Sequence, residues 1–534
     1  MSKYSRRVSR MLAMVAIGAV ALTGCANAEG DSQDDSSGAT TTAYGILGDQ
    51  GDGGTPVSGG TLSFASYAPV TSLDPTVTQP AGATGGTEMA AVYDVLMRYD
   101  TGSRTFEPQL AKSFEESPDF LTWTLKLRDG VTFSDGSPLD ANAVVASINR
   151  YNQRRGANSQ VYTQMVKSTE ARDASTVVFT LNQPWRTFPA MLAYGHGMIV
   201  APSSQQGDKF TPIGAGPYTV VNLQPQQELQ LKARPDYWGG APNLEGLKFV
   251  AIAGEQPKID ALKTNGIDAI YLRNAETVNA AKAEFPGYIE TTSMSMVGQL
   301  NGAPGRPAAD PRVRQAIAFA VDPEVLNQRV RAGEGMPGSD MFQPWSEWFG
   351  GTEGISPDAA KAKELLDQAK ADGYNGKLTY VGVNDPDAQQ LALAVQAQLN
   401  SIGFDVSLET TSSITDMVKR LYIDRNYDMS YGAYSIADVA PEIRLFSSLS
   451  STSTNNILGY KSPEMDALLA KVLSAPDETA KRDAIVEIQK LVNNDQPFLS
   501  WGAGVNYIAW SDKVYRANPT VDGIILFDKA FKKN

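Results

Sequence analysis

The chain has 534 residues, of which 42% are hydrophobic and 20% are charged, and its formal net charge is −13. This length exceeds the size at which one hydrophobic core stops growing, so we expect at least two folded lobes. The negative charge excludes a protein that binds nucleic acid or an anionic membrane surface mainly through electrostatic attraction.

The N-terminus predicts a secretory signal peptide over residues 1–24. Basic residues precede an uncharged run from Met11 to Leu22, which is too short to cross a bilayer. The following LTGC, which ends at Cys25, resembles the lipobox of bacterial lipoproteins, whose cysteine receives a lipid. Because Cys25 is the only cysteine, we expect no disulfide. We therefore predict an exported protein anchored by a lipid on Cys25 to the outer face of the cell membrane. The sequence leaves the export route open, because SRRVSRML also resembles a twin-arginine signal.

Residues 25–59 are predicted to form a disordered tether. They are rich in Gly, Ser, Thr and Asp and contain no Lys or Arg, a composition that cannot bury enough apolar surface to fold. A flexible chain of this length has a reach of roughly 30 Å. The tether would therefore let a globular body move above the membrane.

Strand patterns prevail in the first half of the folded body. The segments GGTLSFAS, LTWTLKLRDGV and STVVFTLNQP predict strands, because apolar residues alternate or cluster between turn residues. SDGSPLDANAVVASINR predicts a turn followed by a helix, with Asp140 as the N-cap. KFVAIAG, a helix and GIDAIYL then predict a strand-helix-strand unit with parallel strands.

Helices prevail in the second half. Asp310 is predicted to cap a helix with Pro311 in its first turn, and Ser356 to cap a helix that ends at Gly373. The buried face of the first helix is expected to consist of Val313, Ala316, Ile317, Ala320 and Val321. LTYVGV, a helix over residues 387–402 and FDVSLET predict a second strand-helix-strand unit. Two more helices are expected over residues 465–473 and 478–493. The sequence thus predicts a large α/β protein.

Few residues of the chain match a catalytic or metal site. His196 is the only histidine, so a site with paired zinc histidines is excluded, and its apolar, glycine-flanked surroundings indicate a structural role. We find no nucleophile elbow, no phosphate-binding loop and no dinucleotide fingerprint. We therefore predict a protein that is not an enzyme and that holds no metal or cofactor.

Six segments together resemble the family 5 extracellular solute-binding proteins, which serve ABC importers of oligopeptides, dipeptides and nickel. They follow the order and spacing of that family and span roughly Gly60 to Lys529. The segments are LAKSFEESPDFLTWTLKLRDGVTFSDGSPLDANAVVASINR, GAGPYTVV, ARPDYWGGAPNLEGLKF, LKTNGIDAI, DPRVRQAIAFAVD and AKAKELLDQA.

The resemblance implies a bilobal α/β clamshell of the periplasmic-binding-protein type, in its type II, large peptide-binder variant. Lobe I is expected over residues 60–299, with an extra subdomain over about 98–199, and the chain returns to it over 497–534. Lobe II is expected over residues 300–496. Ligand would be enclosed between the lobes, and closure would present the membrane permease with a ligand-dependent shape.

The resemblance also implies ligand residues. In peptide-binding members the stretch that matches YDMSYGAYSIADVAPE presents an aromatic residue, backbone groups and an aspartate for the α-amine of the ligand; Tyr434 and Ser435 match the first two. The aspartate position falls on Ala437, with Asp438 one residue later, so either a bulge restores Asp438 or the amine anchor is lost.

Two aromatic residues, Tyr67 and Trp501, lie on segments that face the cleft in relatives, although core packing would also explain each of them. Dipeptide binders place a carboxylate-pairing arginine in the stretch that matches VGVNDPDAQQ, and no arginine stands there. A strict dipeptide ligand therefore fits the sequence poorly.

Three hypotheses for the function follow. The first is a lipid-anchored, monomeric binding protein that captures an oligopeptide or peptide-like solute and delivers it to an ABC permease and its ATPase. The second keeps the fold but changes the solute to a metal chelate, an oligosaccharide or another small metabolite. The third is an exported lipoprotein hydrolase, which leaves the order of the six segments unexplained.

Overall fold

The computed structural model describes residues 44–48 and 50–533. Its main feature is a long mixed sheet with the strand order β11-β12-β13-β2-β14-β20-β15-β19-β17-β18, which β1 joins along β15 and β16 along β20. The strands are β1 (Tyr44–Leu47), β2 (Thr61–Ala65), β11 (Tyr218–Gln224), β12 (Glu228–Ala233), β13 (Gly246–Val250), β14 (Ala269–Leu272), β15 (Gly287–Leu300), β16 (Met336–Pro337), β17 (Lys377–Val383), β18 (Asp405–Thr411), β19 (Met429–Gly432) and β20 (Phe498–Trp510).

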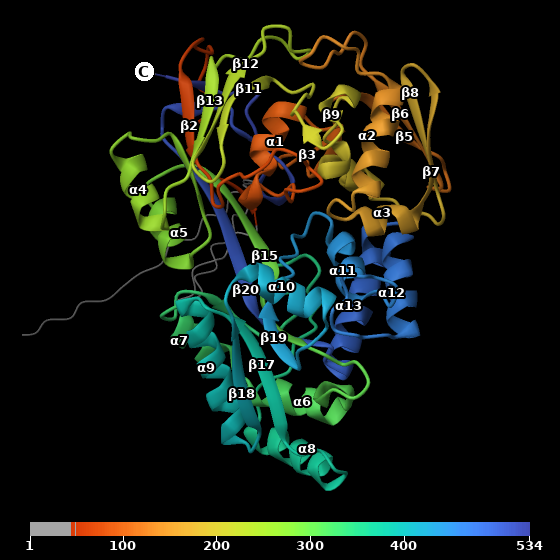
Figure 1. The fold of residues 1–534 in the computed structure, drawn as a ribbon, viewed down its shortest axis with the longest axis vertical. Helices are drawn as coiled ribbons and strands as arrows, with labels where there is room; N and C mark the ends of the chain where they lie inside the picture. Colours follow the sequence, from red (N-terminus) through yellow and green to blue (C-terminus); the bar gives the residue numbers. More distant parts are fainter. Residues whose placement is uncertain (1–43, 49, 534) are drawn as a thin grey trace, which may run out of the picture. The chain divides into compact units, whose positions relative to one another are not determined.

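Two antiparallel strands at the centre of the sheet, β15 and β20, join its two halves (Figure 1). The pairing of β15 and β20 shifts register between Thr292 and Met296, and Met294 in this bulge has a φ of 51°. A bulge increases local twist and bends a strand. The strands therefore change direction where they pass from one half of the sheet to the other.

Each half of the sheet contains parallel strands with covering helices. In the first half, β13 and β14 both run parallel to β2, which lies between them, and α4 (Glu255–Lys263) connects them, followed by α5 (Ala275–Lys282). In the second half, β17 runs parallel to β18 and β19, and α9 (Pro386–Ser401) connects β17 to β18. Both predicted strand-helix-strand units are confirmed, and β2 inserts into the first of them.

A separate four-stranded antiparallel sheet lies within the predicted subdomain. Its order is β5-β6-β8-β7, and its strands are β5 (Ala111–Glu116), β6 (Thr122–Leu127), β7 (Val166–Asp173) and β8 (Thr176–Leu181). The helix α2 (Ala141–Gln153) begins as predicted, because the Asp140 carboxylate accepts a hydrogen bond of 2.8 Å from Ala143 N. The neighbouring short elements are α1 (Gly86–Tyr93), β3 (Met97–Asp100), β4 (Thr105–Pro108), α3 (Ser159–Met165), β9 (Gln205–Gln206) and β10 (Lys209–Phe210).

The second half contains the helices that the sequence predicts, one of them with a different start, and three that it does not predict, Pro323–Val330, Ile414–Val418 and Pro441–Leu449. They are α6 (Pro311–Ala320), α7 (Pro323–Val330), α8 (Ala359–Ala371), α10 (Ile414–Val418), α11 (Pro441–Leu449), α12 (Pro463–Leu473) and α13 (Glu478–Asp495). The predicted cap at Ser356 is wrong. The N-cap of α8 is Asp358, whose carboxylate accepts a hydrogen bond of 2.9 Å from Lys361 N. Both residues are good caps, and the shorter helix keeps its apolar face on the core.

The end of the predicted tether departs from the expectation of disorder. Tyr44–Leu47 form β1, which pairs antiparallel with residues 287–290 of β15. The backbone of β15 offers a free edge there, and Leu47 packs onto the hydrophobic cluster beneath it. Further along, Trp510 Nε1 donates a hydrogen bond of 2.7 Å to Gln50 Oε1. Composition alone missed this strand because its backbone bonds go to a partner far along the chain. The rest of the predicted tether before Tyr44, and Cys25, lie outside the described residues.

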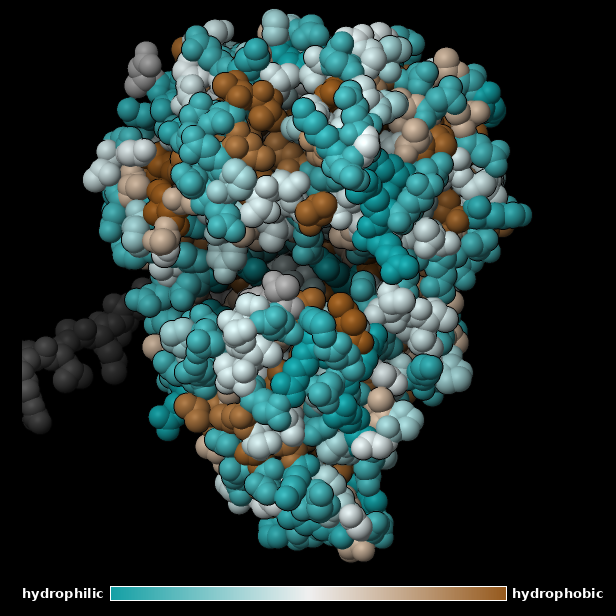
Figure 2. Space-filling model, viewed as in Figure 1, coloured by the Kyte–Doolittle hydropathy of each residue, from teal (hydrophilic) through white to brown (hydrophobic). Residues whose placement is uncertain are grey.

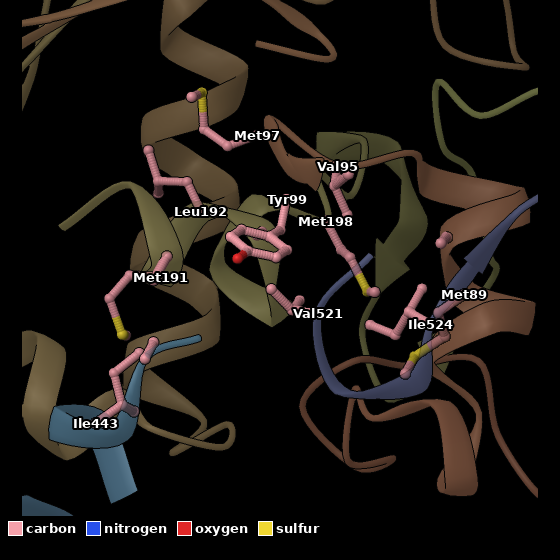
Figure 3. Close-up of a cluster of buried hydrophobic side chains, with 14 of the residues drawn as sticks. Met89, Val95, Met97, Tyr99, Met191, Leu192, Met198, Ile443, Val521 and Ile524 are labelled. Carbon is pink, nitrogen blue, oxygen red and sulfur yellow. The ribbon is translucent and has the colours of Figure 1, made fainter. Parts of the chain in front are cut away.

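The hydrophobic core crosses the predicted lobe boundary. One large cluster joins α1, the subdomain sheet and α11–α13. Figure 3 shows Met191 of the segment Phe188–Ala193 beside Ile443 of α11, with Val521 and Ile524 near the C-terminus in the same cluster. A second cluster fills the space between β17, β18 and α6–α9. The remaining short strand pairs are β21 (Val514–Tyr515) with β24 (Phe531–Lys532) and β22 (Asn518–Pro519) with β23 (Ile525–Leu526).

Hydrophilic side chains predominate on the face drawn in Figure 2, where hydrophobic residues gather only in small groups. Within residues 44–48 and 50–533, none of the helices has the length and apolar character that a bilayer span requires. The predicted limits of the lobes and of the subdomain stay predictions.

Candidate functional site

A cavity of about 510 Å³ lies where β15, β16 and β20 meet the ends of four helices. Its wall includes the starts of α4, α5 and α9 and the end of α7. This volume is in the range of small-molecule sites. The lining residues come from 67–277 on one side and from 295–505 on the other, so the cavity lies between the two halves of the large sheet.

Tyr67 and Trp501 both line this cavity. Tyr67 is 42% exposed, and its ring centroid lies 5.3 Å from Arg273 Cζ. Trp501 is 1% exposed and packs over Gly298, where a Cβ atom would lie 2.5 Å from the indole ring. The glycine therefore lets the indole lie flat on β15. Both the cleft and the packing interpretation of Trp501 apply, because its ring belongs to a core cluster and to the cavity wall.

Tyr434 and Ser435 are the two residues that follow Ala433, which lines the wall. Tyr434 N and Ser435 N both donate hydrogen bonds to Met294 O, at 2.9 and 3.2 Å. The Tyr434 ring packs edge-on against Phe498 with centroids 5.1 Å apart. These contacts fasten the loop after β19 to the bulge of β15, and neither side chain is part of the cavity wall.

Asp438 is buried beside the loop of residues 346–348, and it is not among the residues that line the cavity. Its carboxylate accepts hydrogen bonds from Ser346 Oγ at 2.7 Å and Glu347 N at 3.1 Å, and its carbonyl accepts one from Trp348 Nε1 at 2.9 Å. Burial raises the pKa of Asp438 to about 6. An ionised carboxylate offers about four lone-pair sites. Asp438 therefore secures the 346–348 loop, and these two hydrogen bonds use only part of the acceptor capacity of its carboxylate.

Sequence reasoning missed three charged residues of the wall, Glu255, Arg273 and Arg331. The Glu255 carboxylate accepts hydrogen bonds from Arg273 N at 2.8 Å and Asn274 N at 3.0 Å, and also from the Thr277 hydroxyl. It thereby holds the turn between β14 and α5. No local motif marks these residues, and Arg331 joins the other two in one wall only through the tertiary structure.

A pair of buried carboxylic acids lies near the cavity. Glu290 on β15 accepts a hydrogen bond of 3.3 Å from Asn506 Nδ2 on β20, and burial together with the charge of Asp522 raises the pKa of Glu290 to about 8. Burial also raises the pKa of Asp522, whose carboxylate lies 3.8 Å from Arg444 of α11. Arg273 opposes both shifts by its positive charge.

The raised pKa of Glu290 predicts a pH-dependent stability. The folded state keeps the proton that the unfolded chain releases above about pH 4.5, so the stability of the protein falls as pH rises from there to about 8. We expect Glu290→Gln to remove this loss, which is at most about 1.4 kcal/mol per pH unit for one proton. Urea unfolding of both proteins at pH 5, 6, 7 and 8 measures it, with the exposed Glu170→Gln as the control. Parallel stability curves for the wild type and Glu290→Gln would contradict the assignment.

His196 is a core residue, as its sequence surroundings indicated. Its Nε2 lies 2.9 Å from Asn152 Oδ1, and its ring stacks on Tyr162 with centroids 4.4 Å apart. Burial lowers the pKa of His196 to about 3, so the imidazole is neutral at physiological pH. His196 is not among the residues that line the cavity.

Polar contacts join elements that the sequence assigns to different lobes. They are Arg104 with Glu347 at 2.6 Å, Arg186 Nη1 with Pro476 O at 2.7 Å, Gln160 Nε2 with Thr452 O at 2.9 Å, Asn279 Nδ2 with Glu334 Oε2 at 3.4 Å, and Arg444 with Asp522 at 3.8 Å. The two predicted lobes are therefore in contact with each other outside the cavity wall.

Comparison with known proteins places this geometry among solute-binding proteins. The model of the bacterial extracellular solute-binding proteins, family 5, matches residues 105–456. The probable D,D-dipeptide-binding periplasmic protein DdpA of Escherichia coli K12 is 27% identical over 430 residues, which are 76% of this chain and 82% of DdpA.

Solved structures share the fold. The periplasmic binding protein DppA of Helicobacter pylori, in complex with the peptide STSA, has a TM-score of 0.74 and 24% identity, covering 90% of this chain and 99% of DppA. NikA of Brucella suis, in complex with Fe(III)-EDTA, has a TM-score of 0.70 and 24% identity, and the match covers 89% of this chain and 100% of NikA. The predicted bilobal α/β fold of the peptide-binding type is confirmed.

Proposed function

The chain belongs to the family 5 bacterial extracellular solute-binding proteins, and on that premise we propose that it captures an oligopeptide or peptide-like solute outside the cytoplasm and delivers it to an ABC import permease. The observation that carries the proposal is the cavity between the two halves of the sheet, with Tyr67 and Trp501 in its wall. Aromatic walls supply contact area at a low cost in conformational entropy. The role of the protein is binding without catalysis.

The proposal includes export and anchoring by a lipid on Cys25, with membrane contact through the lipid alone. The permease and its ATPase subunits would be the protein partners, and the binding protein would act as a monomer. Closure around the solute would support delivery, because it presents the permease with a shape that depends on the solute.

A non-peptide solute is the second candidate. It is favoured by the offset between Ala437 and Asp438 and by the absence of an arginine from VGVNDPDAQQ. The NikA neighbour, which was crystallised with Fe(III)-EDTA, shares the fold without a peptide ligand. Native mass spectrometry of the protein from its own host, which detects retained solute, separates the two candidates.

Asp438 provides the sharper test of a peptide solute. If a peptide with a free amino terminus binds, its ammonium is desolvated and needs a carboxylate, and losing one member of a buried charge pair costs about 2–5 kcal/mol. We expect Asp438→Asn to lower the affinity for such peptides at least ~30-fold and to lower the affinity for N-acetylated analogues much less. Calorimetry measures both affinities. Ser346→Ala is the matched control, because it removes one hydrogen bond to Asp438 and keeps the charge. Equal affinity of wild type and Asp438→Asn would restrict Asp438 to holding its loop.

A further inference from the structure

Two arginines line the cavity, and the charge of one of them, Arg273, also acts on the buried acids Glu290 and Asp522. Arg273 and Arg331 line its wall, and neither guanidinium makes a hydrogen bond or ion pair with another side chain in the part of the chain that the structure describes. The whole chain carries a net charge of −13, so it does not lack carboxylates for pairing. Unpaired guanidinium groups in a concave site are ready donors for a planar oxyanion.

Arg273 is held in place by its backbone and by an aromatic ring. Glu255 accepts a hydrogen bond from its main-chain N, which fixes the turn after β14, and Tyr67 lies beneath the guanidinium with 5.3 Å between ring centroid and Cζ. These contacts leave the five N–H donors of the guanidinium free. The arginine is therefore positioned before a solute arrives.

Arg331 reaches the same cavity from the other side. It follows α7, and its N donates a hydrogen bond of 2.8 Å to Asn327 O. The Asn327 side chain in turn accepts a hydrogen bond of 2.9 Å from Gly335 N, which closes the loop that carries Arg331. Arg273 follows β14 in the predicted lobe I, whereas Arg331 follows α7 in the predicted lobe II. A group that binds both would join the two lobes.

The carboxylates of the wall do not neutralise these arginines. Glu255 is engaged with the turn before α5, and Asp387 at the start of α9 is the other acid of the lining. Lys258 Nζ lies 5.6 Å from the Tyr67 ring centroid, but this ammonium is buried and donates hydrogen bonds to Ser66 O and Tyr271 O, at 2.8 and 3.4 Å. The wall thus holds two arginines and two acids, and the carboxylate of one acid, Glu255, is engaged by the backbone of the turn.

We propose that the cavity takes a solute that carries an oxyanion group, a carboxylate or a phosphate, and that Arg273 and Arg331 bind this group from the two lobes. This inference deepens the proposed function and rests on it. Binding would then depend on the charge of the solute, because an anionic group is attracted to both guanidinium groups whereas a neutral group is not. The acidic body of the protein would otherwise disfavour such a solute.

The test uses matched probes that differ only in charge. Three pairs are titrated by Trp fluorescence and calorimetry: a pool of C-terminally amidated Asp/Glu tetrapeptides against its Asn/Gln pool, aldonic acids against the parent sugars, and sugar phosphates against the same sugars. Native mass spectrometry of the wild type from its host supplies any retained solute as a further probe. The variants are Arg273→Gln and Arg331→Gln, with Arg329→Gln as the control, because Arg329 is exposed on α7 and outside the cavity wall.

We expect at least one anionic probe to bind at least ~10-fold more tightly than its neutral partner, with the carboxylate and phosphate pairs distinguishing the two sources of the anion. Arg273→Gln and Arg331→Gln should each lower the affinity for that probe at least ~10-fold and remove the preference for the anionic probe over its neutral partner. Arg329→Gln should bind the probe as the wild type does. Binding or retention of neutral or cationic solutes alone would overturn the anion assignment and leave the carrier function intact. If no probe binds and no solute is retained, the carrier function fails, and this inference fails with it.

Discussion

Replacing Glu442 by alanine is expected to lower the free energy of unfolding by about 3–5 kcal/mol, because it leaves a buried lysine without its counter-charge. Lys481 Nζ lies 2.9 Å from Glu442 Oε2, and the two side chains are 5% and 1% exposed. Such a large loss from a single truncation is rare for residues outside a packed apolar core.

The contacts around this ion pair explain the size of the effect. Glu442 belongs to α11 and Lys481 to α13, and the Thr187 hydroxyl of the subdomain donates a hydrogen bond to the Glu442 carboxylate. Lys481 Nζ also lies 4.7 Å from the centroid of the Trp348 ring. The pair therefore joins two helices, the subdomain and the loop that Asp438 holds.

Urea unfolding followed by circular dichroism measures this prediction. The double variant Glu442→Met with Lys481→Met removes both charges, so we expect it to lose much less stability than Glu442→Ala alone. Asp367→Asn breaks the exposed Lys363–Asp367 pair, whose side chains are 61% and 55% exposed, and should cost less than about 1 kcal/mol. A loss below about 1 kcal/mol for Glu442→Ala would mean that water or another group compensates Lys481.

The second large effect is expected at the proposed anchor. Cys25→Ala should move nearly all of the protein from the membrane fraction to the soluble fraction, because the lipid is the proposed anchor and the acidic chain is not attracted to anionic lipid. Immunoblots of washed membranes and of the culture medium from the native host measure the distribution.

Controls make that result specific to lipid. Thr23→Ala changes the segment before Cys25 and keeps the thiol, so we expect the protein to stay with the membranes, and mass spectrometry of the wild-type N-terminus should show a mass increase on Cys25. Retention of Cys25→Ala in membranes after a salt wash would contradict a lipid anchor. Solute binding by the released protein should be unchanged, since the cavity is built from residues 67–505.

The sequence by itself determined most of the local structure, because caps and apolar periodicity act over a few residues. Asp140 and Asp310 cap helices as their positions indicated, and both strand-helix-strand units appear where alternation changed to helical spacing. The error at Ser356 has the same local scale, since Asp358 two residues later is an equally good cap. The order of six segments also indicated the family, which the family model confirms.

Only the tertiary structure decided which side chains share the cavity. Tyr67 and Trp501 are far apart in the chain and meet in one wall, whereas Asp438 lies against the 346–348 loop. Arg273 and Arg331 carried no signal in the sequence, because an arginine after a strand or a helix is usually solvated. Their proposed role rests on their place in one cavity wall, where their guanidinium groups form no side-chain hydrogen bond or ion pair among the described residues. That placement depends on contacts between segments that are distant in sequence and near in space.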